Sequence, residues 1–412
     1  VRFTFRSYEM RTEKVSSLGL LCAYVLCPTA QADDFQAALQ NGTVNGNIRA
    51  YYNTRDYEAE GATDESAFAL GGALRAESAQ WYSLKFGLGY YTAQDLGTND
   101  DDPAKVNKRL GSELEVLGEA YITTTMLDST FTVGRQKINT PFANAGDAFI
   151  IPFTFEAASL SNQSLDNITF ELAHINTIKN RNSADFVDVG RWSTGRYGVD
   201  PASTAGTTAA GVKFAQNELN LALWYYNYSD LFTTLYGHAD YTFASSGSIT
   251  PFIAAQYVTQ SDTGDELLGT VSSDLYGIQG GIKFGSSKLT LAYNSVSEDE
   301  DSFNNGAFLT PYSFSTSPIF TNNMLTTLEN VDAGEASKLT FNHQWNALAF
   351  KASYAVFDYE QAVDRNATDL DITYKLDQWQ PGLTVRWRLE VVDGDEDNVE
   401  QMNNRFQLQL VY

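Results

Sequence analysis

The feature that most constrains the fold is a strict alternation of apolar and polar residues that recurs along the chain. In residues 383–391 every odd position is apolar and every even position is polar or charged. Side chains of a β-strand point alternately to its two faces, so this segment has one apolar and one wet face. Every second residue is likewise apolar in residues 84–90, 219–225, 289–293 and 348–356, starting from the first residue of each segment. The sequence therefore predicts an all-β protein.

A soluble β-sandwich also alternates, so further features must separate it from a membrane barrel. The predicted strands are about ten residues long, the length that a tilted strand needs to cross a bilayer. Tight turns such as 285–287 alternate with long polar loops such as 294–335, as in outer-membrane barrels. Aromatic residues gather near strand ends, for example Tyr90 and Tyr91, where a membrane-interface girdle would place them. These features favour a transmembrane barrel.

The end of the chain supports closure of that barrel. Phe406, Leu408, Leu410 and Tyr412 alternate with polar residues, so the chain ends within an amphipathic strand. Pairing of the last strand with the first removes sheet edges that lipid could not satisfy. At about 21 residues per strand and connection, we expect an antiparallel barrel of about 18 strands, with about 16 as the alternative. A barrel of this size encloses an aqueous lumen.

Residues 1–32 have the pattern of a secretory signal peptide. Basic residues from Arg2 to Lys14 precede an apolar stretch at 15–26, and an A-x-A cleavage site ends at Ala32. A membrane anchor needs roughly 20 apolar residues, and this stretch is shorter. Both cysteines of the chain lie in this segment, so we expect a barrel domain at 33–412 without disulfides. The expected location is the outer membrane of a Gram-negative bacterium, reached through the periplasm.

The chain is strongly acidic, with a formal net charge of −24. Nucleic-acid affinity rests on clustered Lys and Arg, so we expect no nucleic-acid partner. Acidic runs at 99–102, 298–301 and 393–397 lie between predicted strands and indicate solvated loops. Divalent cations that bridge these runs to lipopolysaccharide are a minority alternative. Pore selectivity depends on the local field in the lumen, so an acidic chain can still conduct anions.

Several short motifs, in their order and spacing, resemble the OprD-type family of outer-membrane porins. Residues 48–57 (IRAYYNTRDY) look like the family's opening L-R-N-x-Y-x-N-R-D-Y. Residues 151–156 (IPFTFE) are similar to its L-P-x-T-F-E-G, and residues 179–183 (KNRNS) to its K-x-R-N-S. Residues 385–388 (VRWR) resemble its penultimate, arginine-bearing strand. The resemblance covers essentially all of 33–412 and implies a selective eighteen-stranded channel for small hydrophilic solutes such as carboxylates or amino acids.

The resemblance also implies a constriction. The stretch 138–166 is then the third external loop, which folds into the barrel and narrows it. Pro141 and Pro152 agree with this interpretation, because proline is excluded from central strands. The alternative is a plain surface loop. The constriction residues expected from the resemblance are Pro141, Asp147, Pro152, Phe153, Phe155 and Glu156.

Two positions depart from the family pattern. Phe149 stands where the family often has arginine, and Ala157 replaces the glycine that closes the motif. The family's ligand specificity is therefore not carried over to this chain.

Arginines on the wet face of the strands are the candidate solute-contacting residues. Arg386 and Arg388 are two positions apart and share one face. An arginine that faces lipid costs roughly 2–4 kcal/mol at the bilayer midplane, so both should face the lumen. In the family a ladder of basic residues guides carboxylates, and the resemblance assigns Arg49, Arg135, Arg386 and Arg388 to it. The alternative is that Arg388 only pairs with Glu390 in a crowded wall.

Two other classes of protein remain as alternatives to a channel. A barrel enzyme of the phospholipase kind needs a nucleophile beside a histidine, and none of His174, His238 and His343 is flanked by such a motif. A soluble secreted sandwich that binds a ligand would be extracted without detergent. We expect a channel with no enzymatic activity, no cofactor and no metal site. The expected partners are outer-membrane lipid, lipopolysaccharide and small solutes, and association into a homotrimer stays open.

Overall fold

The structure is a computed structural model that describes residues 32–110, 113–146, 148–312, 316–396 and 398–412. Residues 1–31 of the expected signal peptide and Asp147 therefore lie outside the described residues. The described helices are α1 (Ala32–Gln40), α2 (Val189–Arg196) and the short 3-10 helix η2 (Phe303–Gly306). No helix in these ranges has the length and apolar character needed to span a membrane.

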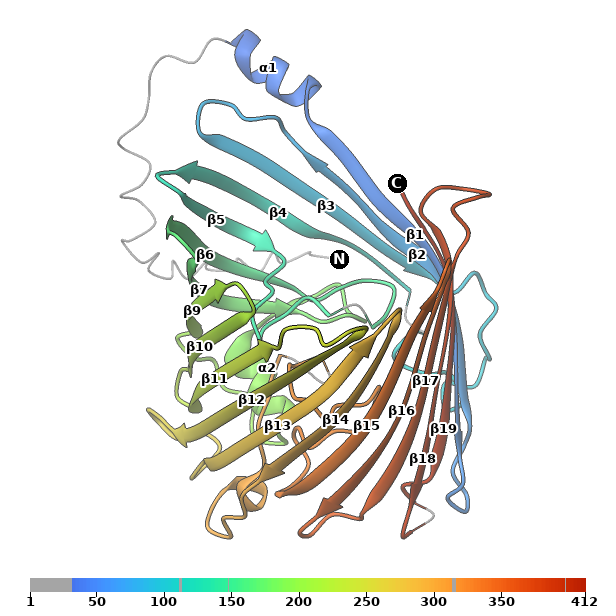
Figure 1. Cartoon of the computed structure of the whole chain (residues 1–412). Coiled ribbons are helices and arrows are strands. Elements are labelled where there is room, and N and C mark those ends of the chain that lie inside the picture. Colours follow the sequence, from blue (N-terminus) through green and yellow to red (C-terminus); the bar gives the residue numbers. More distant parts are fainter. Residues whose placement is uncertain (1–31, 111–112, 147, 313–315, 397) are drawn as a thin grey trace, which may run out of the picture.

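The rest of the ordered architecture is one antiparallel β-sheet (Figure 1). Its strands are β1 (Thr43–Tyr57), β2 (Glu65–Glu77), β3 (Leu84–Gln94), β4 (Leu114–Met126), β5 (Ser129–Gln136), β6 (Thr154–Leu165), β7 (Ile168–Lys179), β8 (Phe186–Asp188), β9 (Thr207–Gln216), β10 (Leu219–Tyr228), β11 (Phe232–Thr242), β12 (Ile249–Asp262), β13 (Ser272–Phe284), β14 (Ser287–Val296), β15 (Gly334–Trp345), β16 (Leu348–Tyr359), β17 (Arg365–Lys375), β18 (Leu383–Gly394) and β19 (Gln401–Val411).

The sheet closes on itself because β1 pairs with both β2 and β19. Strand β8 is a three-residue branch that pairs only with β7, and β7 continues the barrel by pairing with β9. Eighteen of the described strands thus form a closed barrel. The predicted antiparallel barrel of about 18 strands is confirmed.

Short turns join the strands at one end of the barrel, as predicted. Several of these turns contain an asparagine in the left-handed region, with φ of 64° at Asn167, 52° at Asn217 and 49° at Asn346. Asparagine tolerates this conformation better than most residues, so it permits a reversal within two residues. The longer connections, including residues 137–153, 180–206 and 297–333, all lie at the opposite end.

The alternation in the sequence separates an apolar outer face from a polar inner face. On β18 and β19 the outward Val385 and Phe406 are 41% and 48% exposed, whereas the inward Glu390 and Arg405 are almost fully buried. Large apolar side chains are exposed in the same way around the barrel, for example Leu291 at 63%. Such a belt is compatible with lipid and unfavourable in water.

The barrel interior is partly filled by connections from the long-loop end. We call residues 137–153 the constriction loop and residues 297–333 the long loop. Phe142 of the constriction loop packs against Tyr226 and Tyr236 of the wall and Phe308 of the long loop, with ring centroids 5.2–5.6 Å apart. The buried apolar residues therefore lie inside the lumen, between loops and wall.

The constriction loop is shorter than the sequence suggested. The expected loop reached residue 166, but β6 begins at Thr154, directly after the proline-containing segment. Phe155 and Glu156 are therefore strand residues, because both pair with β5 on one side and with β7 on the other. This corrects their assignment to the loop.

Candidate pore constriction

The constriction loop crosses the lumen and is fixed at both sides. At the β1 side the Arg49 guanidinium donates to the carbonyl of Phe149, and Tyr51 Oη donates to the carbonyl of Ala148 at 3.1 Å. On the other side Asn144 Nδ2 donates to the carbonyl of Thr316 in the long loop at 3.3 Å. The segment thus lies inside the barrel and is not a plain surface loop.

The predicted prolines and phenylalanines have distinct places in this arrangement. Pro141 is half-buried, next to the buried Phe142. The carbonyl of Pro152 accepts a 2.8 Å hydrogen bond from Nζ of the fully buried Lys179. Phe153 is buried beside the lumen, and the fully buried Phe155 packs edge-on against Tyr312 of the long loop, with centroids 6.2 Å apart.

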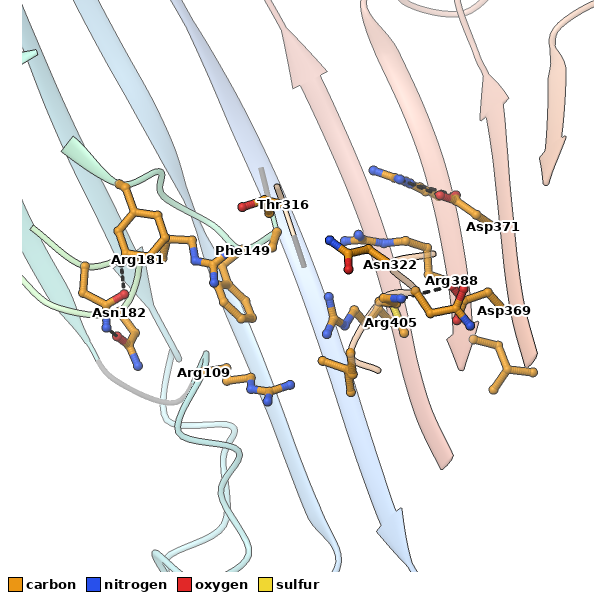
Figure 2. Close-up of a pocket in the computed structure, with 18 of the residues that line it drawn as sticks. Arg109, Phe149, Arg181, Asn182, Thr316, Asn322, Asp369, Asp371, Arg388 and Arg405 are labelled. Atoms are coloured by element: carbon orange, nitrogen blue, oxygen red, sulfur yellow. Dashed lines mark hydrogen bonds and ion pairs between the residues drawn. The ribbon is translucent and has the colours of Figure 1, made fainter. Parts of the chain in front are cut away.

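A cavity of about 620 Å³ lies between the constriction loop, the long loop and the wall of β16–β19 (Figure 2). Figure 2 shows Arg181 and Phe149 on one side of this cavity and Arg388, Asp369 and Asp371 on the other. Its charged lining residues are Arg109, Arg181, Arg196, Lys351, Arg386, Arg388 and Arg405, against Asp369 and Asp371. Among the described residues, basic side chains thus outnumber acidic ones in the cavity of a strongly acidic protein.

Arg181 is the most enclosed of the basic loop residues. Its guanidinium lies over the rings of Phe149 and Phe153, 4.7 and 4.6 Å from their centroids. Its Nε and Nη1 are buried without a hydrogen-bond partner in the described part of the chain. Burial, together with the positive charges of Arg405 and Arg109, lowers the pKa of Arg181 to about 9. The side chain stays cationic at neutral pH and has donors free for a solute.

Arg109, from the connection between β3 and β4, faces the same cavity. Burial, together with the positive charges of Arg55 and Arg405, lowers its pKa to about 10. One of its terminal nitrogens, Nη1, is likewise buried without a partner among the described residues. Neither loop arginine has a carboxylate partner among the described ion pairs, so both present positive charge to the lumen.

The two arginines predicted from the alternation of β18 both line the cavity. Arg386 forms an ion pair with Asp371 of β17, with Nε–Oδ1 and Nη2–Oδ2 distances of 2.8 and 2.5 Å. Arg388 Nη2 donates to Tyr51 Oη at 3.0 Å. No described ion pair joins Arg388 to Glu390, the alternative, and one Glu390 oxygen accepts the backbone N–H of Thr326.

The two other arginines predicted for the basic ladder, Arg49 and Arg135, differ in their placement. Arg49 faces the lumen, but it is buried and bonded to Gln409 and the constriction loop, so it supports the loop. Arg135 shares the outer face of β5 with Val133 and pairs with Glu156 of β6 at 2.9 Å. The structure therefore brings Arg386 and Arg388 together at the cavity and leaves Arg135 and Glu156 outside it.

Several cavity residues were not predicted. Arg405 and Asp371 could have been found, because each alternates with apolar residues on its strand. Arg109, Arg181 and Arg196 lie in connections between strands, where no periodicity shows which side chains face the lumen. For these three the sequence contains no such signal.

One histidine is closer to a nucleophile than the sequence indicated. His343 Nδ1 lies 2.8 Å from Ser287 Oγ, its direct cross-strand neighbour. His174 contacts Thr208, and His238 contacts Asp240. A catalytic triad also needs a group that orients the histidine, and no described ion pair joins a carboxylate to His343.

A closed eighteen-stranded barrel with an apolar outer belt and a loop-narrowed polar lumen defines a membrane channel of the porin class. The family described as outer membrane porin, OprD family, matches residues 37–405. The chain therefore belongs to the OprD family and is an outer-membrane porin through which small hydrophilic solutes pass. A search among curated proteins found no match.

Solved structures show the same fold at low identity. OccK9 (OpdG) of Pseudomonas aeruginosa is 17% identical, with a TM-score of 0.75 over 91% of this chain and 100% of its own. OpdK of Pseudomonas aeruginosa, solved with vanillate, is 16% identical with a TM-score of 0.75 over 91% and 99%. OccK2 (OpdF) of Pseudomonas aeruginosa, in complex with glucuronate, is 16% identical with a TM-score of 0.73 over 91% and 97%.

Proposed function

We propose that this porin favours small anionic solutes that carry a carboxylate. The observation that carries the proposal is the excess of arginine over carboxylate among the charged residues that line the cavity between the two loops. Guanidinium groups bind carboxylates through paired, charge-assisted hydrogen bonds, and they attract anions more strongly in a narrow lumen than in bulk water. The ligands of OpdK and OccK2, vanillate and glucuronate, both carry a carboxylate.

Within this proposal the basic residues have two roles. Arg181, Arg109 and Arg388 present charge to the solute, since none of them has a carboxylate partner among the described ion pairs. The charge of Arg386 is partly balanced by its ion pair with Asp371, and Arg49 supports the constriction loop. Arg135 is not part of the basic ladder.

Liposome swelling tests the proposal with two solutes of one size. Purified protein in liposomes should admit a small monocarboxylate faster than the corresponding neutral amide, and Arg181→Gln should reduce the difference. Lys105→Gln is the matched control, because Lys105 is an exposed loop cation that pairs with Asp100 outside the cavity. Equal rates for carboxylate and amide in the parent protein would refute the proposal.

We also propose that the chain has no enzymatic activity. The Ser287–His343 contact is a cross-strand pair on the outer face near the short-turn end, and serine and histidine pair there as ordinary neighbours. A serine-reactive fluorophosphonate should leave Ser287 unlabelled. Labelling that Ser287→Ala removes would support a hydrolase instead.

Two further expectations stand as proposals. Residues 1–32 act as a cleaved signal peptide, which the N-terminal sequence of protein purified from outer membranes would check. Lipopolysaccharide surrounds the barrel at its long-loop end. Mass measurement in detergent would decide whether three barrels associate.

A further inference from the structure

A turn of the long loop, residues 322–327, lies against the inner wall of the barrel and forms one side of the cavity. Four of its residues, from Asn322 to Leu325, line the cavity. Figure 2 shows Asn322 on the same side as Asp369, opposite Arg181 of the facing connection. The position of this turn therefore sets the free width between the two sides.

The wall beneath the turn contains two buried carboxylates. Asp369 of β17 and Glu390 of β18 are direct cross-strand partners and are 6% and 0% exposed. Like charges directly opposite on neighbouring strands destabilise a sheet, and a buried carboxylate is costly without hydrogen-bond donors. The wall strands by themselves do not explain why two carboxylates are buried side by side.

The turn supplies the donors. The backbone N–H of Met324 donates to Asp369 Oδ2, and the N–H of Thr326 donates to Glu390 Oε1, each at 3.0 Å. The second oxygen of each carboxylate, Asp369 Oδ1 and Glu390 Oε2, is buried without a donor in the described part of the chain. The turn and the carboxylates thus depend on each other. The backbone N–H groups of the turn offset the cost of burying the carboxylates, and the carboxylates hold the turn against the wall.

Neighbouring strands add further attachments. Nζ of the buried Lys338 on β15 donates to the carbonyl of Asn322. Asn323 Nδ2 donates to the carbonyl of Ala367 at 3.1 Å, and Ser353 Oγ donates to Asn323 Oδ1 at 3.4 Å. The turn is therefore attached to four adjacent strands, β15 to β18.

We infer that Asp369 and Glu390 are positioning residues that hold the turn 322–327 against the wall and so set the width of the pore, and that acid releases the turn. The inference rests on the proposed function, because the turn matters only if solutes pass through this cavity. An ionised carboxylate accepts an N–H more strongly than a protonated one, so the attachment weakens as pH falls.

The charged groups around the pair support this direction. Lys338 on β15, Lys351 on β16 and Arg405 on β19 face the pair from the wall. The turn itself contributes no ionisable side chain. The basic groups are cationic in acid, whereas the carboxylates lose their charge. Their neutralisation leaves the cations unopposed beside the turn.

Single-channel conductance in planar bilayers tests the inference. The parent channel should widen, and so conduct more, as pH falls from neutral to about 4 and the carboxylates take up protons. The double variant Asp369→Asn with Glu390→Gln should already show the larger conductance at neutral pH and lose the acid step. Glu390→Asp, which retains the charge but shortens the reach, should also conduct more. Asp240→Asn is the matched control, because Asp240 is a wall carboxylate that bonds only to wall residues in the described structure.

A reversible cross-link gives a second measurement, in which one folded variant is compared with itself in its oxidised and reduced forms. Asn323→Cys combined with Ser353→Cys places two thiols where the present side chains touch. Oxidation should abolish the acid step and reduction should restore it. An acid step that persists in the double variant or in the cross-linked protein would overturn the inference. Anion selectivity, measured in the same channels, tests the proposed function separately, because an unselective channel refutes that function whether or not an acid step is seen.

Discussion

Arg386 and Asp371 form a two-point ion pair across β18 and β17, on the wall of the arginine-lined cavity. We expect opposite effects on ion selectivity from replacing its two members. Asp371→Asn removes one negative charge from the cavity wall and should raise the preference for anions, whereas Arg386→Gln removes one positive charge and should lower it. One charge acting over roughly 15 Å at an effective dielectric constant of about 20 amounts to about 1 kcal/mol, or roughly five-fold in the permeability ratio. Reversal potentials under a salt gradient would measure both changes, and shifts in the same direction would contradict the account.

Arg388 provides a comparison on the same strand face. It has no carboxylate partner among the described ion pairs and donates to Tyr51. The double replacement Arg386→Gln with Arg388→Gln should shift permeability toward cations and slow carboxylate uptake, with little loss of barrel stability because Gln is suited to a wet lumen. Unchanged uptake with a normal heat-modifiable band on gels would show that these arginines only support the wall.

The constriction loop can be shortened without touching a strand. Deletion of residues 142–150 removes the segment between the two prolines and stops before β6 begins at Thr154. We expect a larger single-channel conductance and an intact barrel, because the barrel pairing uses only strand residues. A deletion protein that folds with parent conductance would mean that the segment does not obstruct the pore.

The pKa values of the loop arginines predict a pH dependence in alkali. Burial and neighbouring arginines lower the pKa of Arg181 to about 9 and that of Arg109 to about 10. The positive charge of a base is lost as pH rises through its pKa, so anion preference should be constant around neutral pH and fall as pH approaches these values. Arg181→Gln should remove the first part of that fall. A preference that declines already below pH 8 would contradict this assignment.

The apolar–polar alternation of the strands predicted the inner face of β18, and together with strand length and the order of short and long connections it predicted the barrel. It also predicts the lumen side of Arg405, which alternates with the outward Phe406 on the last strand. The same rule places Arg135 on the outer face with Val133, so the alternation was right where the resemblance was misleading. At the loop end of β5 an outward arginine is tolerated, because it pairs with Glu156 and the cost falls near the membrane interface.

The loop contribution to the site could not be predicted in this way. Arg109 and Arg181 reach the cavity because their connections fold inward, and that folding depends on contacts between distant residues. One example is the hydrogen bond from Arg49 to the carbonyl of Phe149, a hundred positions away. The turn fixed by Asp369 and Glu390 is another, since its partners lie on strands that follow it in sequence.

Ion selectivity of the reconstituted parent channel tests the central claim most directly. A single purified channel in a planar bilayer, under a gradient of potassium chloride at neutral pH, gives the ratio of chloride to potassium permeability from its reversal potential. The account predicts a preference for chloride, because arginines outnumber carboxylates in the lining of the cavity between the loops although the chain carries a net charge of −24. A preference for potassium would contradict it, since the acidic loops and not the arginines would then determine which ions pass.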